Sequence, residues 1–128
     1  MPRIVTIISF GYMHASAVPE SDLALDVRRL VPAVEDPALD GLTGLDCLVQ
    51  QRVLASPEAR SLAVQTAVGT HMLMDDTDLA QLTIAIGSFG GCRRAVVIAR
   101  HIATRLAELN IGGAYALVVE HRDLGRPS

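Results

Sequence analysis

The sequence contains no lysine and no tryptophan, and aromatic residues make up only 3% of its 128 residues. The core must therefore be built from Val, Ile, Leu and Ala, which supply most of the 50% hydrophobic content. All 11 basic residues are arginines, and the formal net charge is −3. This balance argues against a broad electrostatic attraction to nucleic acid, so any phosphate binding requires a local site.

Cysteine is also scarce, since Cys47 and Cys92 stand far apart and form neither a CxxC motif nor a Cys/His cluster. This spacing argues against a structural zinc site, and we expect neither a metal ion nor a cofactor. A reduced, cytoplasmic setting is the simplest interpretation of two isolated thiols. No stretch is long and apolar enough to span a membrane, and no membrane partner is expected.

The chain is long enough for one domain with a sizeable core. Residues 3–9 form a β-branched run typical of a strand covered on both faces. Serine, proline and glutamate at 56–58 form a typical helix start, and Gly69 is expected to end that helix. In all, the pattern predicts strands at 3–9, 23–30, 81–87 and 114–120, and helices at 42–54, 57–68 and 94–109.

The alternation of these elements predicts an α/β fold in which residues 1–128 form a single domain. We expect a mostly parallel or mixed four-stranded sheet with flanking helices. Its most informative part is a strand, a glycine-rich loop and a helix in direct succession, "TIAIGSFGGCRRAVV" at 83–97. Free backbone N–H groups and the positive end of the helix dipole meet in such a turn, so the sequence predicts an anion site there.

Two common phosphate motifs do not fit this loop. The P-loop requires GK[ST], and the chain has no lysine. The glycine spacing also differs from the dinucleotide fingerprint, and no acidic residue follows at the required distance. A tight turn with solvent-facing arginines is an alternative, but two cations at the positive end of a helix are unfavourable without an anion.

A third template fits the length of the loop, because the segment from Ser88 to Arg94 has as many residues as the C-x5-R loop of cysteine phosphatases. Its first position is a serine, whose hydroxyl is a poor nucleophile without an adjacent base, and Cys92 is misplaced for attack. The spacing therefore favours binding over catalysis, and we expect no catalytic residue. The alternative is a phosphatase or phosphotransferase that uses His121 or Asp26 as acid or base.

Five segments, taken in order, resemble the C-terminal domain of the RNase adapter protein RapZ. They are "SFGYMH", "DLALDVRRL", "LTGLD", "TIAIGSFGGCRRAVVIARHIA" and "HRDLG". The resemblance covers nearly the whole chain and implies a free-standing version of that domain, with the last few residues expected to be disordered. The loop departs from the family pattern C-T-G-G-x-H-R-S at Ser88, Phe89, Arg93 and Ala95.

The resemblance implies a sugar-phosphate-binding α/β domain that senses glucosamine-6-phosphate, binds a small regulatory RNA and presents it to a ribonuclease. It also implies self-association, so we expect a homo-oligomer. The expected function is thus a non-catalytic regulatory adapter whose partners are a phosphorylated small molecule and an RNA or a protein. An adapter that binds RNA through charge alone would need a contiguous arginine surface around Arg28, Arg93 and Arg122.

The candidate ligand-binding residues fall into two groups. The first is the loop itself, namely Ser88, Phe89, Gly90, Gly91, Cys92, Arg93 and Arg94. The second surrounds it: the resemblance implies ligand-site roles for Asp26, Arg28, Thr43 and Gly44, while His121 and Arg122 follow the last strand, where open α/β sheets place ligands.

Overall fold

The computed structural model describes residues 2–14 and 17–125. Its four strands form one wholly parallel sheet in the order β2-β3-β1-β4, which confirms the α/β prediction and excludes the mixed alternative. The disorder expected of the last few residues concerns 126–128, which lie outside the described part. The strands are β1 (Ile4–Gly11), β2 (Leu23–Asp26), β3 (Gln81–Ser88) and β4 (Ala116–His121), and the helices are α1 (Cys47–Leu54), α2 (Pro57–Asp76) and α3 (Arg94–Leu109).

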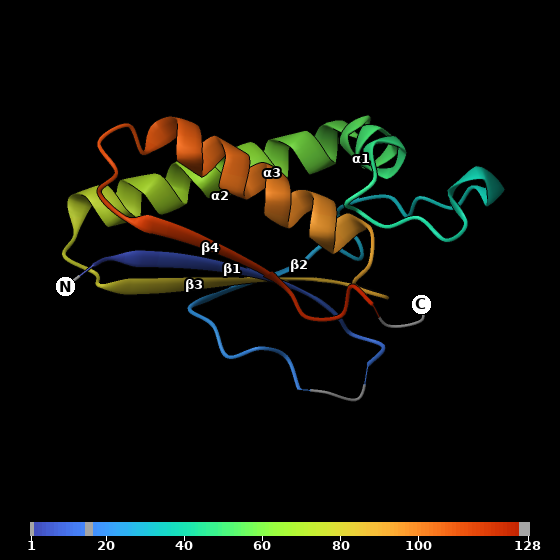
Figure 1. Ribbon diagram of the computed structural model, residues 1–128, viewed down its shortest axis with the longest axis horizontal. Helices are drawn as coiled ribbons and strands as arrows, with labels where there is room; N and C mark the ends of the chain where they lie inside the picture. Colours follow the sequence, from blue (N-terminus) through green and yellow to red (C-terminus); the bar gives the residue numbers. More distant parts are fainter. Residues whose placement is uncertain (1, 15–16, 126–128) are drawn as a thin grey trace.

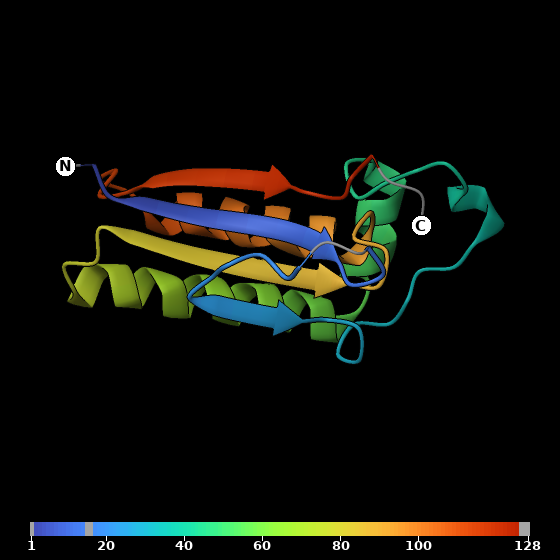
Figure 2. The same ribbon diagram turned by 90° about the horizontal axis from the view of Figure 1, so that it is seen from below.

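All three helices lie on the same face of the sheet (Figures 1 and 2). Alternate residues of the central strands point into this interface, where Val5, Ile7, Ile84 and Ile86 are fully buried. On the opposite face the strands present partly exposed side chains such as Thr6. The core is therefore a single layer of aliphatic side chains between sheet and helices, as the shortage of aromatic residues requires.

The prediction that Gly69 ends its helix is wrong, because α2 continues for seven more residues to Asp76. The buried stripe of the helix extends past the glycine to Met74, so burial in the hydrophobic core outweighs the local cost of glycine. Arg3 stabilises the extended end, since its guanidinium donates to the carbonyls of Met74 at 2.6 Å and Thr77 at 3.0 Å.

The predicted end of β2 and the predicted start of α1 also differ from the structure. Strand β2 ends at Asp26 rather than at residue 30, because the chain turns after Val27 and the Val31 N–H donates to the Val27 carbonyl. Helix α1 begins at Cys47 rather than at residue 42. The Asp46 carboxylate accepts the N–H of Thr43 at 2.8 Å, so residues 43–46 form a turn before the helix.

Gly69→Ala is expected to raise the free energy of unfolding by about 1 kcal/mol, since glycine in an exposed helix interior loses more backbone entropy on folding than alanine. A Cβ atom at this position would meet no other atom within 4 Å, so the methyl group adds no strain. Urea denaturation of both proteins measures the difference. Gly112→Ala, also in open space but outside any helix, serves as the control, and a destabilised Gly69→Ala would contradict the packing described here.

Candidate functional site

The glycine-rich loop lies at the carboxyl ends of β1 and β3, where Gly11 pairs with Ser88. From this point the chain after β3 enters α3 on the helical face, whereas the chain after β1 returns along the other face to β2 (Figure 2). Two neighbouring strands whose connections leave in opposite directions form a topological switch point. Open α/β sheets bind ligands in the crevice at such a point.

The segment after β1 holds the loop through three successive backbone carbonyls. Tyr12 N–H donates to the Ser88 carbonyl at 2.9 Å, and Met13 N–H donates to that of residue 89 at 3.0 Å. The His14 Nε2–H group donates to the carbonyl of residue 90 at 3.0 Å. A trans peptide points its N–H opposite to its carbonyl, so the N–H groups of residues 89 and 90 face away from this segment.

Helix α3 begins directly after the loop, as predicted, and its first turn offers further donors. Within the described residues, the backbone N–H groups of Arg94, Ala95 and Val96 donate to no other protein group. A helix cannot satisfy these first N–H groups internally, and they carry the positive end of its dipole. The start of α3 therefore remains available to an anion.

The two loop arginines have different roles. Arg93 donates from its guanidinium to three backbone carbonyls of the 31–42 connection, those of Val34, Leu39 and Leu42, at 2.7–3.2 Å. Through these contacts Arg93 holds that connection against the loop. Arg94 donates only through Nη1, to the carbonyls of residues 28 and 31 at 3.2 and 2.9 Å, and forms no ion pair with another described residue.

A hollow of about 200 Å³ lies beside the loop. It is lined by residues 88–94 on one side and by Ala33, Val34 and Glu35 on the other. Burial lowers the pKa of the Arg94 guanidinium, and the nearby carboxylates of Asp26 and Glu35 partly oppose this shift. Because arginine stays protonated in proteins, the hollow contains a partly desolvated cation beside unpaired N–H groups.

Of the residues predicted around the loop, Asp26 and Arg28 lie next to Arg94 but do not line the hollow. Their side chains form an exposed ion pair at 2.7 Å, and the Arg28 guanidinium lies 3.8 Å from the centre of the Tyr12 ring. The contact lowers the pKa of Asp26, mainly through hydrogen bonding to Arg28. Tyr12 was not singled out by the sequence, because a contact between separate loops has no sequence signature.

Thr43 and Gly44 support the loop from the side of α1. The N–H of Gly44 donates to the Cys92 carbonyl at 2.8 Å, and the Thr43 hydroxyl accepts the N–H of Leu45 at 3.2 Å. Cys92 itself is buried, with Sγ 3.5 Å from the Asp123 carbonyl. The structure thus brings these predicted residues to the loop, but neither Thr43 nor Gly44 lines the hollow.

His121, which ends β4, and Arg122, which follows it, also lie outside the lining of the hollow. His121 forms a hydrogen bond of 2.7 Å between Nδ1 and the hydroxyl of Ser9, which is fully buried. Arg122 pairs at 3.0 Å with Asp123, a fully buried carboxylate that also accepts the N–H of Gly11 at 2.7 Å. Asp123 thus anchors the end of β1 beside the loop, a role that the sequence does not reveal because its partner lies 112 residues away.

Burial, followed by the charge of Arg100, lowers the pKa of His121 below its ordinary value of about 6.5. The folded protein therefore binds fewer protons at this site than the unfolded chain, and the stability contribution is complete only above the unfolded pKa. We expect the free energy of unfolding to fall as the pH decreases from 7 to 5, and to fall less in His121→Gln. Denaturation curves at several pH values test this.

Any pH dependence of stability that remains in His121→Gln is expected to come from His101, whose pKa is also lowered by burial and by Arg105. The double variant with His101→Gln is therefore the control, and its slope should be the smallest of the three proteins. An unchanged slope in both variants would contradict the assigned shifts. Since His121 is neutral at pH 7, it supplies no cation to a nearby anion site.

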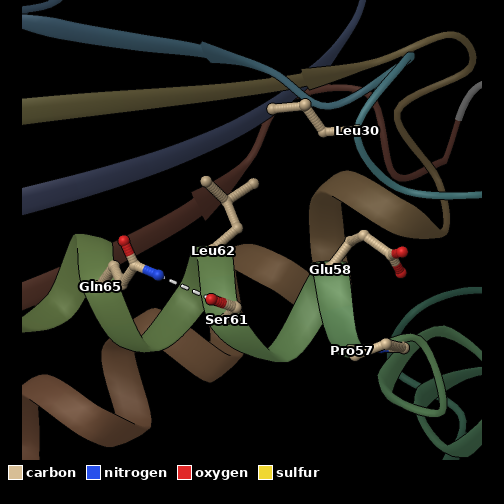
Figure 3. A pocket seen from close by; sticks show the side chains of 6 residues that line it. All are labelled: Leu30, Pro57, Glu58, Ser61, Leu62 and Gln65. Carbon is tan, nitrogen blue, oxygen red and sulfur yellow. Dashed lines mark hydrogen bonds between the residues drawn. The ribbon is translucent and has the colours of Figure 1, made fainter.

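A larger hollow of about 430 Å³ lies away from the loop, beside the first turns of α2 (Figure 3). It is lined by Leu30, Pro57, Glu58, Ser61, Leu62 and Gln65, which include an acidic side chain and no basic one. An anion would find no cationic partner among these side chains. The smaller hollow, by contrast, is lined by Arg94 and lies beside the unpaired N–H groups that begin α3.

Neither a metal-binding cluster nor a membrane-spanning helix is found in the described part of the chain. None of its His, Cys, Asp and Glu side chains gather in threes or more in a way that could hold a metal ion. No helix in residues 2–14 and 17–125 has both the length and the apolar character needed to cross a membrane.

The family model of the RapZ C-terminal domain matches residues 3–125 of the chain. A nucleotide-binding protein of Rubrobacter xylanophilus is 40% identical over 124 residues, which cover 94% of this chain and 40% of the relative. Proteins of the same name are 38% identical in Moorella thermoacetica, covering 96% and 40%, and 38% identical in Acidothermus cellulolyticus, covering 94% and 40%. The chain therefore spans about two fifths of the length of these curated relatives.

Proposed function

The chain belongs to the RapZ C-terminal domain family, and from this membership we propose that it binds a phosphorylated small molecule without transforming it. The phosphate occupies the hollow formed by residues 88–94, and ligand occupancy alters an interaction with a partner. The relatives are named nucleotide-binding proteins, and a nucleotide also presents a phosphate group. Two cysteines that lie far apart in the sequence agree with a reducing cytoplasm as the site of this function.

One observation carries the proposal, namely the half-buried Arg94 beside the unpaired N–H groups that begin α3. A guanidinium and several backbone N–H groups directed to one place form the usual recognition set for phosphate. Without a ligand, the cation and the helix dipole repel each other. A dianionic phosphate would remove this repulsion and provide acceptors for both.

We propose a sugar phosphate such as glucosamine-6-phosphate as the ligand. Glu35 supports this choice, because the residue lines the same hollow as Arg94 and its carboxylate acts electrostatically on that guanidinium. A carboxylate would accept hydrogen bonds from an ammonium or hydroxyl group of the ligand. The phosphate end would then meet Arg94 and the loop, while the polar groups of the sugar meet Glu35. The opposing charges at the two sides of the hollow favour a ligand that itself carries both donors and an anion.

Isothermal titration calorimetry tests the function directly. We expect binding of inorganic phosphate and of glucosamine-6-phosphate, and no binding of uncharged glucosamine at the same concentrations. The affinity should fall as the salt concentration rises, because the contact with phosphate is electrostatic. Absence of binding by both phosphate compounds would refute the proposal.

The enzymatic alternative has less support from the geometry of the loop. The Ser88 side chain is buried, and its Oγ accepts the N–H of Gly91 at 3.1 Å, so it braces the loop instead of facing a substrate. His121, a candidate acid or base, is hydrogen-bonded to Ser9 and does not line the hollow. A nucleophile and its base need to lie within hydrogen-bonding reach of the substrate, and these two do not share the hollow.

The connection to a partner would pass through Arg94. Its Nη1 group holds the carbonyls of Arg28 and Val31, so a phosphate that attracts this guanidinium would loosen the turn between them. RNA has less support as the partner, because Arg28, Arg93 and Arg122 are all engaged in internal contacts. We therefore favour a protein partner.

We propose that self-association uses the sheet face that no helix covers (Figure 1). All-parallel sheets usually have both faces covered, and this face presents Ile8, half-buried, and Val118, exposed. Light scattering coupled to size-exclusion chromatography would detect the homo-oligomer. A monomer at high protein concentration would refute this part of the proposal.

A further inference from the structure

Phe89 is an exposed aromatic side chain at the rim of the phosphate hollow. Phe89 lines the hollow and is 57% exposed, although the chain has only two phenylalanines and two tyrosines. The other three aromatic rings, Phe10, Tyr12 and Tyr115, are buried or half-buried. Leaving the one remaining ring in water sacrifices burial worth about 2 kcal/mol, so its position calls for an explanation.

The backbone of Phe89 is held firmly while its side chain is left in solvent. Its carbonyl accepts the N–H of Met13 at 3.0 Å, in the middle of the three bonds that fix the loop. The ring is therefore mounted on a braced segment instead of a loose one. A fixed aromatic surface loses little conformational entropy when a ligand packs against it.

The hollow has one polar side and one apolar side. Arg94 and the start of α3 supply the charged side, whereas Phe89, Ala33 and Val34 supply apolar surface. At about 200 Å³ the hollow is smaller than the 300–1,000 Å³ typical of sites for drug-sized ligands. Its size suits a phosphate group together with a single ring.

We propose that Phe89 is a specificity-determining residue that packs against the ring of a ring-bearing phosphomonoester. The proposal rests on the phosphate-binding function argued above and names the ligand class of that site. Aromatic side chains stack on nucleobases and on other flat, partly apolar faces, including those of sugar rings. The site thus prefers cyclic phosphomonoesters to inorganic phosphate and to open-chain esters.

The test compares ligands that share the phosphate but differ in the attached group. Calorimetry is carried out with inorganic phosphate, glycerol 3-phosphate, glucosamine-6-phosphate and adenosine 5′-monophosphate. For the unmodified protein we expect at least one cyclic ester to bind about tenfold more tightly than the two acyclic compounds, as expected for one stacked ring. The sugar and nucleotide arms show which kind of ring is preferred.

In Phe89→Ala the tenfold preference is expected to disappear, while the affinity for inorganic phosphate stays unchanged. Ile111→Ala is the matched control, because it also removes an exposed apolar side chain but lies beyond the far end of α3. It should leave all four affinities unchanged. Thermal melting of both variants confirms that each remains folded.

The outcomes separate this inference from the function on which it rests. Binding of inorganic phosphate with no preference for cyclic esters would overturn the role of Phe89 and leave phosphate binding intact. A Phe89→Ala protein that loses affinity for all compounds equally would also overturn it, since the ring would then act on the loop rather than on the ligand. Failure of every phosphate compound to bind would overturn the underlying function.

Discussion

Gly91→Ala is expected to lower the free energy of unfolding by about 4 kcal/mol and to abolish phosphate binding, because two separate costs act together. Gly91 has a φ of +78°, a backbone conformation that residues with a Cβ atom rarely adopt. A Cβ atom would also lie only 2.4 Å from the backbone nitrogen of Gly11. Backbone cannot move aside as a flexible side chain can, so β1 and the loop would have to separate.

Urea denaturation and phosphate calorimetry measure the two consequences. The control is Gly112→Ala, whose added Cβ atom meets nothing within 4 Å and which should leave both measurements unchanged. If Gly91→Ala is too unstable to purify, the milder Gly113→Ala separates strain from contact. Gly113 has a φ of +66° but open space around it, so it should show only the conformational cost. A Gly91→Ala protein as stable as the control would contradict the close approach of the loop to the end of β1.

The periodicity of the sequence predicted the element types well because it follows burial against the sheet. Helix α3 begins and ends where expected, because its apolar stripe and the helix-ending residues after it indicate the same boundary. Glycine as a helix-ending signal failed at Gly69, where burial of the helix beyond the glycine outweighs a local penalty of about 1 kcal/mol. The predicted start of α1 at residue 42 was also wrong, because the Asp46 carboxylate accepts the N–H of Thr43 and residues 43–46 form a turn before the helix.

The candidate site was predictable only where one continuous segment forms it. The spacing of the loop predicted an anion cradle, and the structure places this loop at the switch point of the sheet. The spacing could not distinguish Arg93 from Arg94, because their different roles depend on carbonyls more than fifty residues away. The same limit applies to Asp123, whose buried carboxylate serves a strand at the other end of the chain.

Arg94→Gln is expected to weaken the binding of inorganic phosphate about a hundredfold, equivalent to about 2.7 kcal/mol. This is the range expected from losing one or two charge-assisted hydrogen bonds in a partly desolvated site. Glutamine keeps an N–H donor but is shorter than arginine, so a loss of stability from the weakened contacts with the carbonyls of Arg28 and Val31 is also expected. Calorimetry gives the affinity, and urea denaturation shows how much stability is lost.

Arg94→Lys and Arg105→Gln sharpen the interpretation of that result. Lysine retains the charge but loses the planar fork, so an intermediate loss of about tenfold is expected if the guanidinium grips two phosphate oxygens. Arg105 lies in the last part of α3 in an exposed pair with Glu108, and its replacement should leave phosphate affinity unchanged. Equal affinity in Arg94→Gln and the unmodified protein would mean that the anion binds elsewhere. A lysine variant as weak as the glutamine variant would instead show that geometry, more than charge, determines recognition.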